Sequence, residues 1–180
     1  MQLVILDRDG VINEDTPDHI RSPEEWQPLP GSLEAIARLN RAGWHVVVAT
    51  NQSGIARKFY DLDTLVRIHE KMHRAVREAG GQIDAVFFCP HVAQDNCHCR
   101  KPAPGLFLDI ARRLRIELQG VPAIGDSLRD LQAARAVGAR PILVKTGQGM
   151  LTLEHGVEPD IAVFNNLGCA VDALLTVDAG

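Results

Sequence analysis

Several features common in other protein classes are scarce in this 180-residue sequence. It has no excess of basic residues, because 19 Lys and Arg stand against 23 Asp and Glu, for a net charge of −4. That balance argues against a nucleic-acid scaffold, which normally presents a basic face. Aromatic residues make up 4% of the chain, and Trp26, Trp44 and Tyr60 are too scattered to suggest a stacking platform. We therefore expect no nucleic-acid partner.

Long apolar runs are also missing. No stretch approaches the roughly 18 apolar residues needed to span a bilayer. The N-terminus passes from a short apolar stretch directly to charged residues, without the basic start, long apolar run and cleavage site of a signal peptide. We expect no membrane partner and a cytoplasmic location, where thiols stay reduced. With no internal repeat, linker-like tract or exposed apolar stripe, we expect a monomer with a single domain over residues 1–180.

What the chain does contain is a regular alternation of short Val- and Ile-rich runs with segments of helical period. Uninterrupted apolar runs are typical of strands buried on both faces of a parallel sheet. The strand candidates are residues 3–6, 45–50, 85–89, 122–125, 142–145 and 161–163, and the helix candidates are residues 32–42, 62–79, 103–114, 128–137 and 167–175. This order predicts an α/β fold with a doubly wound, Rossmann-like parallel sheet, whose ligands bind beyond the carboxyl ends of the strands.

The first predicted strand ends in two carboxylates, Asp7 and Asp9, followed by Gly10. Alternation along an extended chain puts both acids on one side, and glycine lets the backbone turn away sharply. Two carboxylates this close repel each other, and a divalent cation relieves the conflict. Oxygen ligands of this kind suit Mg²⁺. The alternative is a solvated strand end with ordinary turn residues.

The second predicted strand ends in a run of neutral hydrogen-bonding side chains, Thr50, Asn51, Gln52 and Ser53. Donors of this kind can hold phosphate oxygens without adding much charge. The alternative is an ordinary loop, and this signal is weak when it stands alone.

Two further signals follow later strands. Arg100 and Lys101 precede a helix, where Lys101 could neutralise a phosphoryl group and Arg100 could grip a second anion, although solvated charges are the commoner case. Asp126 and Asp130 are four residues apart at a helix start, where they could bind an ion or simply cap the helix. The predicted fold brings all four signals to one edge of the sheet.

In this chain order, the motifs resemble the haloacid dehalogenase-like phosphatases. The matching pieces are Asp7-Arg8-Asp9-Gly10-Val11, Thr50-Asn51, Lys101 and Gly125-Asp126 with Asp130, over about residues 3–145. The resemblance implies a Mg²⁺-dependent phosphomonoester hydrolase that works through a phosphorylated aspartate. Many relatives carry an inserted cap domain, but both places for one are too short here, so we expect a single phosphatase domain with no cap domain.

The resemblance also implies a role for each matching residue. Asp7 is the nucleophile, and Asp9 first protonates the leaving oxygen and then activates water. Thr50 and Lys101 hold the phosphoryl oxygens. Mg²⁺ lies between the Asp7 carboxylate, the backbone carbonyl of Asp9 and Asp126, because an anionic nucleophile approaching a phosphate dianion needs positive charge.

Cysteine is rare, yet three of the four cysteines fall within one short segment. The candidate metal ligands there are Cys89, His91, Cys97, His98 and Cys99. A structural zinc site takes four sulfur or nitrogen ligands, and we favour Cys89, His91, Cys97 and Cys99, with His98 pointing away. Such a zinc-binding loop over residues 89–102 would fix Arg100 and Lys101. The alternatives are a reactive dithiol pair or unrelated buried thiols.

A similar Cys-Pro-His…Cys-x-Cys-Arg-Lys-Pro loop marks the subgroup of the family that acts on heptose bisphosphates or on histidinol phosphate. By this resemblance, the sugar or its second phosphate contacts Arg100 and the residues Asp15, Thr16, Pro17 and Asp18. The run from Thr50 to Arg57 resembles the heptose members, while the short metal loop resembles both. We favour removal of the 7-phosphate from a heptose 1,7-bisphosphate, in a route to surface glycans such as lipopolysaccharide. Histidinol phosphate stays open, and so does any contact by Ser127, where some heptose members have Lys.

His69-Glu70-Lys71-Met72-His73 matches the His-Glu-x-x-His pattern of zinc metalloproteases. However, the apolar residues around it recur at helical spacing, as in a helix packed on a sheet. We expect packing or border histidines at His69 and His73. A third class, a non-catalytic zinc-stabilised binding module, predicts no phosphate release at all.

Overall fold

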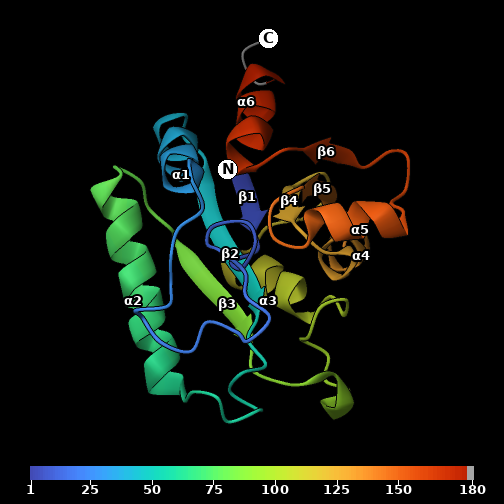
Figure 1. Cartoon of the computed structure of the whole chain (residues 1–180). Helices are drawn as coiled ribbons and strands as arrows, with labels where there is room; N and C mark the ends of the chain where they lie inside the picture. The colour runs from blue at the N-terminus through green and yellow to red at the C-terminus, as the bar shows by residue number, and fades with distance from the viewer. Residues whose placement is uncertain (178–180) are drawn as a thin grey trace.

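The computed structural model describes residues 1–177, which form one six-stranded parallel sheet with helices on both faces (Figure 1). The strands are β1 (Leu3–Leu6), β2 (His45–Asn51), β3 (Ala85–Cys89), β4 (Pro122–Gly125), β5 (Arg140–Val144) and β6 (Ala162–Phe164). The helices are α1 (Ser32–Arg41), α2 (Leu62–Glu78), α3 (Gly105–Leu114), α4 (Leu128–Arg135), α5 (Gly149–His155) and α6 (Leu167–Val177), with a 3₁₀ turn η1 at Ala93–Asp95. The predicted fold class is confirmed.

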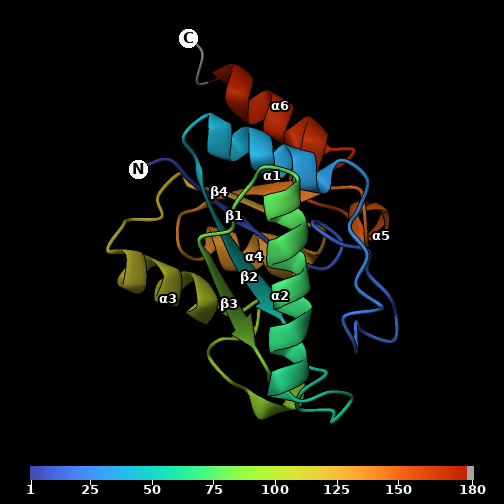
Figure 2. The same cartoon turned by 90° about the vertical axis from the view of Figure 1, so that its left-hand side faces the viewer.

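The strand order is β3-β2-β1-β4-β5-β6. Successive strands are therefore added on one side of β1 up to β3 and on its other side from β4 onwards, although β1 and β4 run parallel. In β1, Val4 and Leu6 face the core layer formed with α1, α2 and α6. Leu3 and Ile5 face the opposite layer, formed with α3 and α4. Because both faces of the central strands are covered, these strands need apolar side chains at every position. Figure 2 shows α1, α2 and α6 on one side of the sheet and α3 on the other.

The sequence predicted all six strands and five of the six α-helices, but it missed α5 and η1. Helix α3 begins at Gly105 rather than Ala103, because Pro104 disfavours a helical conformation in the residue before it. Strand β5 begins two residues earlier than predicted, and α4 ends two residues earlier. Helix α2 begins after Asp61, whose side chain caps it by accepting a hydrogen bond from the Thr64 backbone N–H.

The two segments that could hold an inserted domain are short loops. In the described chain, residues 7–31 form no helix, and residues 90–104 contain only η1. Neither segment holds a domain within the described residues, so the carboxyl edge of the sheet is bordered by loops. Among residues 1–177, the longest helix falls short of the length and apolar character that a bilayer-crossing helix requires.

Candidate active site

A cavity of about 260 Å³ opens at the carboxyl ends of β1, β2 and β4, next to the point where the strand order reverses. This is the place where open α/β sheets bind their ligands. The side chains that line it carry both signs of charge. They are Asp7, Asp9, Asp15, Thr16, Pro17, His19, Thr50, Asn51, Ser53, Arg57, Arg100, Lys101, Asp126, Ser127, Arg129, Asp130 and Gln148.

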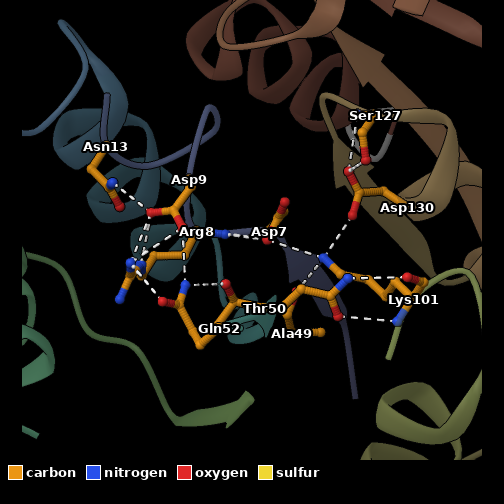
Figure 3. A network of polar contacts seen from close by, with 11 residues as sticks. Asp7, Arg8, Asp9, Asn13, Ala49, Thr50, Gln52, Lys101, Ser127 and Asp130 are labelled. Carbon is orange, nitrogen blue, oxygen red and sulfur yellow. Dashed lines mark hydrogen bonds and ion pairs between the residues drawn. The ribbon is translucent and has the colours of Figure 1, made fainter. Parts of the chain in front are cut away.

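Lys101 stands at the centre of the charged network (Figure 3). Its ammonium group lies 3.0 Å from Asp7 Oδ1 and 2.6 Å from Asp130 Oδ1, and it donates to the Ala49 carbonyl at 2.8 Å. Burial alone would lower the pKa of Lys101, but the two carboxylates outweigh burial and raise it. The lysine is therefore a fixed positive charge beside Asp7.

The two hydrogen bonds to Asp7 leave one of its oxygens free. Lys101 and the Arg8 backbone N–H both contact Oδ1, at 3.0 and 2.7 Å. Within residues 1–177, no donor is found for Oδ2. The carboxylate is thus held from one side, and Oδ2 is the oxygen available to a ligand.

Three carboxylates, Asp7, Asp126 and Asp130, converge so that one oxygen from each lies within 4.8 Å of the others. Burial, and then the charge of Asp130, raises the pKa of Asp7 to about 7 and that of Asp126 to about 9. Asp130 behaves differently: burial would raise its pKa, but the Lys101 charge together with hydrogen bonds from Lys101 and Ser127 lowers it. Crowded carboxylates that resist ionising are suited to a divalent cation, and this oxygen donor set fits Mg²⁺.

Asp130 is tied to the start of α4 as well as to Lys101. Its Oδ2 accepts hydrogen bonds from the backbone N–H and the hydroxyl of Ser127, at 3.0 and 2.7 Å. The sequence left capping and ion binding open for this residue. The structure shows capping combined with an ion pair to Lys101.

Asp9 is held by a set of donors separate from those of Asp7 (Figure 3). Arg8 Nε and Asn13 Nδ2 donate to its Oδ1, at 2.9 and 2.8 Å. Gln52 Nε2 and Arg8 Nη2 donate to its Oδ2, at 2.9 and 3.2 Å. Burial would raise the pKa of Asp9, but the Arg8 charge and these hydrogen bonds lower it. The structure therefore presents Asp9 as a well-stabilised carboxylate.

The side chains after β2 serve different purposes. Thr50 and Ser53 line the cavity. Asn51 also borders it, but its amide exchanges two hydrogen bonds with the backbone of Lys101, both at 3.0 Å. Gln52 lies outside the cavity, buried among Asp9 and other protein groups. The predicted substrate contact at Gln52 therefore has no support from its position, because its amide is already used within the protein.

The loop after β1 brings three of its four predicted contacts to the cavity. Asp15, Thr16 and Pro17 line it, whereas Asp18 is exposed, pairs with Arg21 and does not reach it. The next residue, His19, does line the cavity, and its Nε2 lies 3.2 Å from the Ser53 hydroxyl. His19 adopts a left-handed backbone conformation, with φ of 65°, which the sequence pattern did not reveal.

The sequence also missed two basic residues in the cavity, Arg57 and Arg129. They are close enough to Arg100 that, together with burial, their charges lower its pKa. Arg100 Nη1 donates to the His91 carbonyl at 3.1 Å, which anchors it to the cysteine-rich loop. Arg57, Arg100 and Arg129 form what we call the arginine cluster, a positive region in addition to Lys101.

Cys89, His91, Cys97 and Cys99 gather into the only other group of potential metal ligands found among residues 1–177. Their sulfur and nitrogen atoms approach to between 3.0 and 3.6 Å. His98 is exposed and outside the group, as predicted. The backbone N–H of Arg100 points to Cys97 Sγ at 3.4 Å, so the cluster connects directly to the cavity. A set of three thiols and one imidazole fits a closed, four-ligand zinc site.

His69 and His73 belong to no metal-binding group within the described residues. They lie half-buried on α2, whose core-facing side is Leu65, Ile68, Met72 and Val76. The expected packing of this helix on the sheet is confirmed. Leu62 and Val66, which lie on other faces of the helix, are exposed.

Comparison with known proteins gives consistent matches. A family model described as polynucleotide kinase 3 phosphatase matches residues 3–127, and one described as HAD-hydrolase-like matches residues 98–170. A curated relative from Bordetella bronchiseptica, named D-glycero-beta-D-manno-heptose-1,7-bisphosphate 7-phosphatase, is 56% identical, covering 97% of this chain and 98% of its own. A relative of the same name from Pseudomonas putida is 51% identical, covering 97% and 100%.

Solved structures agree with these relatives. The crystal structure of D,D-heptose 1,7-bisphosphate phosphatase from B. bronchiseptica, complexed with magnesium and phosphate, superposes with a TM-score of 0.96. It is 54% identical and covers 98% of this chain and 99% of its own. The corresponding enzyme from Burkholderia thailandensis has a TM-score of 0.78 and 48% identity, covering 98% and 99%.

Proposed function

The chain belongs to the haloacid dehalogenase-like phosphatases, and we propose that it hydrolyses the 7-phosphate of D-glycero-D-manno-heptose 1,7-bisphosphate to give heptose 1-phosphate and phosphate. The observation that carries the proposal is the position of Asp7. One of its oxygens is held by Lys101 and the other is open to the cavity, beside Asp126 and Asp130. The relatives named for this reaction match nearly the full chain.

In the first half of the proposed reaction, Asp7 Oδ2 attacks phosphorus and forms an aspartyl-phosphate. The bond from phosphorus to the sugar oxygen breaks, and Asp9 delivers a proton to that oxygen. Lys101 and Thr50 hold the phosphoryl oxygens. The Asp7 and Asp126 carboxylates and the Asp9 backbone carbonyl would hold Mg²⁺, which supplies positive charge against the repulsion between nucleophile and phosphate.

In the second half, Asp9 acts as a carboxylate and takes a proton from the water that attacks the aspartyl-phosphate. Phosphate leaves, and Asp7 is restored. Arg8, Asn13 and Gln52 stabilise the ionised Asp9 that the first half produces. Asp9 can serve both half-reactions because it loses a proton to the sugar oxygen in the first and gains one from water in the second.

The arginine cluster supports a bisphosphate substrate. When one phosphate of such a substrate lies at Asp7, its second phosphate can be bound by Arg57, Arg100 and Arg129, which line the same cavity. Guanidinium groups suit this role because they bind phosphate bidentately. Histidinol phosphate carries one phosphate, with a cationic amine beside it and an imidazole at its other end, so it offers these arginines no second anion to bind. Asp15, Thr16, Pro17 and Ser53 would contact the sugar.

Residues 1–180 act as one phosphatase domain, a monomer in the cytoplasm, that supplies heptose for surface glycans such as lipopolysaccharide. Cys89, His91, Cys97 and Cys99 would hold Zn²⁺ in a structural role, because four protein ligands leave no position for a reacting water. The ion would keep Arg100 and Lys101 in place through the loop that they share with these ligands.

A kinetic comparison tests the proposal. With Mg²⁺ present, kcat/KM for heptose 1,7-bisphosphate should exceed that for histidinol phosphate by at least about 100-fold, as expected for two charge-assisted hydrogen bonds to the second phosphate. A preference for histidinol phosphate would reverse the substrate assignment. Asp7→Asn should reduce turnover at least about 1000-fold, whereas the control Asp109→Asn, which alters an exposed pair with Arg112, should not.

A further inference from the structure

The His-Glu-x-x-His segment on α2 contacts the proposed active site without lining it. His69 lies with its Nε2 3.2 Å from Nη1 of Arg8. Its ring also meets the Phe88 ring of β3 edge-on, with centroids 6.4 Å apart. Arg8 follows Asp7 in the first motif, so a side chain from α2 reaches the residue between the two proposed catalytic carboxylates.

Arg8 is fully buried, and the contacts found for it are specific. Nε and Nη2 grip the Asp9 carboxylate, and Nη2 also donates to Gln52 Oε1 at 3.2 Å. Nη1 donates to His69 Nε2. A buried guanidinium needs acceptors for its N–H groups, and His69 satisfies the nitrogen that does not bind Asp9.

Because arginine can only donate, Nε2 of His69 must accept, which requires a neutral imidazole with its proton on Nδ1. Burial, and then the nearby Arg8 charge, lower the pKa of His69 to about 3, so the ring is neutral at physiological pH. Helix α2 is itself fixed to the loop after β1, since Lys71 donates to the carbonyls of Pro23 and Trp26 at 2.6 and 2.8 Å. The acceptor is therefore presented from a fixed helix.

We propose that His69 is a positioning residue for Asp9. By accepting a hydrogen bond from Arg8, His69 holds the guanidinium in the orientation in which Arg8 binds the Asp9 carboxylate. The proposal rests on the proposed role of Asp9 as acid and base. Misplacing a reacting group by about 1 Å can cost about 100-fold in rate. Losing the acceptor would let Arg8 turn towards other acceptors and carry Asp9 with it, while the residues that bind the substrate stay in place.

The experiment compares three variants by steady-state kinetics on heptose 1,7-bisphosphate with Mg²⁺. His69→Leu removes the acceptor and should lower kcat about 10- to 100-fold with little change in KM. His69→Gln places an amide oxygen near the position of Nε2 and should recover most of kcat. The control is His73→Leu on the same helix, which should leave kcat unchanged. Within residues 1–177, no hydrogen bond is found for the His73 side chain. Circular dichroism melts confirm that each variant is folded.

A direct measurement on the unmodified protein keeps the test independent of variant folding. Nitrogen-15 NMR should report a neutral His69 with the proton on Nδ1. A proton on Nε2, or a His69→Leu variant with normal kcat, would overturn the proposal. Asp9→Asn separates the two levels of inference. If Asp9→Asn turns over normally, the proposed mechanism fails; if it is inactive while His69→Leu is normal, only the role of His69 fails.

Discussion

Gly10 faces the Asp126 carboxylate so closely that a Cβ atom at Gly10 would lie 2.0 Å from Asp126 Oδ2. Gly10 also has a φ of 79°, which side chains other than glycine rarely adopt. Glycine is therefore required at position 10 for two reasons. It allows the backbone turn after β1, and it leaves room for the Asp126 carboxylate that follows β4.

Gly10→Ala is therefore expected to damage both stability and activity. The left-handed conformation alone costs an alanine about 1–2 kcal/mol, and the clash adds to that by displacing Asp126. The matched control is Gly120→Ala, with a φ of 76° and open space around the added atom. Urea denaturation should show a loss of about 1–2 kcal/mol for the control and more for Gly10→Ala. Only Gly10→Ala should lower kcat, and equal effects of both on kcat would contradict this interpretation.

The arginine cluster should act on the second phosphate of the substrate. Arg129→Ala is expected to raise KM for heptose 1,7-bisphosphate about tenfold, in line with the loss of one charge-assisted hydrogen bond. It should leave KM for a heptose 7-phosphate unchanged, since that substrate lacks the 1-phosphate. Arg112→Ala removes an arginine from an exposed pair with Asp109 and serves as the control. An equal rise in KM for both substrates would place Arg129 elsewhere.

The cysteine cluster should contribute stability through its metal. Cys99→Ser removes one of four candidate ligands and is expected to lower the free energy of unfolding by more than about 4 kcal/mol. Cys169→Ser, on α6 and outside the cluster, should have a much smaller effect. Chelation should also reduce activity in a way that Zn²⁺ restores and additional Mg²⁺ does not. Metal analysis that finds no zinc in the purified protein would contradict the assignment.

His69 should make stability depend on pH. Its pKa falls from an ordinary 6.5 to about 3 on folding, so the unfolded chain binds the proton more readily. Stability from this residue is complete above pH 6.5 and is lost as pH falls towards 3, with a decrease of about 1.4 kcal/mol between pH 7.5 and 5.5. Denaturation curves of the wild type and His69→Gln at both pH values measure it. The variant should lack this part of the decrease, and an unchanged pH dependence would show that His69 titrates normally in the fold.

Residues whose signal is local could be predicted from the sequence. The strands are continuous apolar runs, so the sequence alone places β1 and β4, and the acids Asp7 and Asp126 that follow them, at one edge of a parallel sheet. The four-ligand set of the cysteine loop followed from short spacing in the same way.

The tertiary structure alone decided how neighbouring residues divide between the cavity and the interior. Ser53 lines the cavity while Gln52 turns inward to Asp9, and His19 reaches the cavity while Asp18 does not. In a loop, the direction of each side chain depends on the turn and on distant partners, which no local period records. Arg57 and Arg129 carry no motif of their own, and only folding brings them to Arg100.

Helix α2 also has features that the sequence determined and a contact that only the tertiary structure decided. The amphipathic period of the sequence determined that a helix would pack on the sheet there, because apolar residues recurred on one face. That His69 would meet a buried Arg8, 61 positions away in the chain, depended on how the helix lies over β3 and on the turn after β1. A sequence sets which side chains are buried through local periodicity, but long-range contacts arise from the packing of whole elements, which the three-dimensional fold alone specifies.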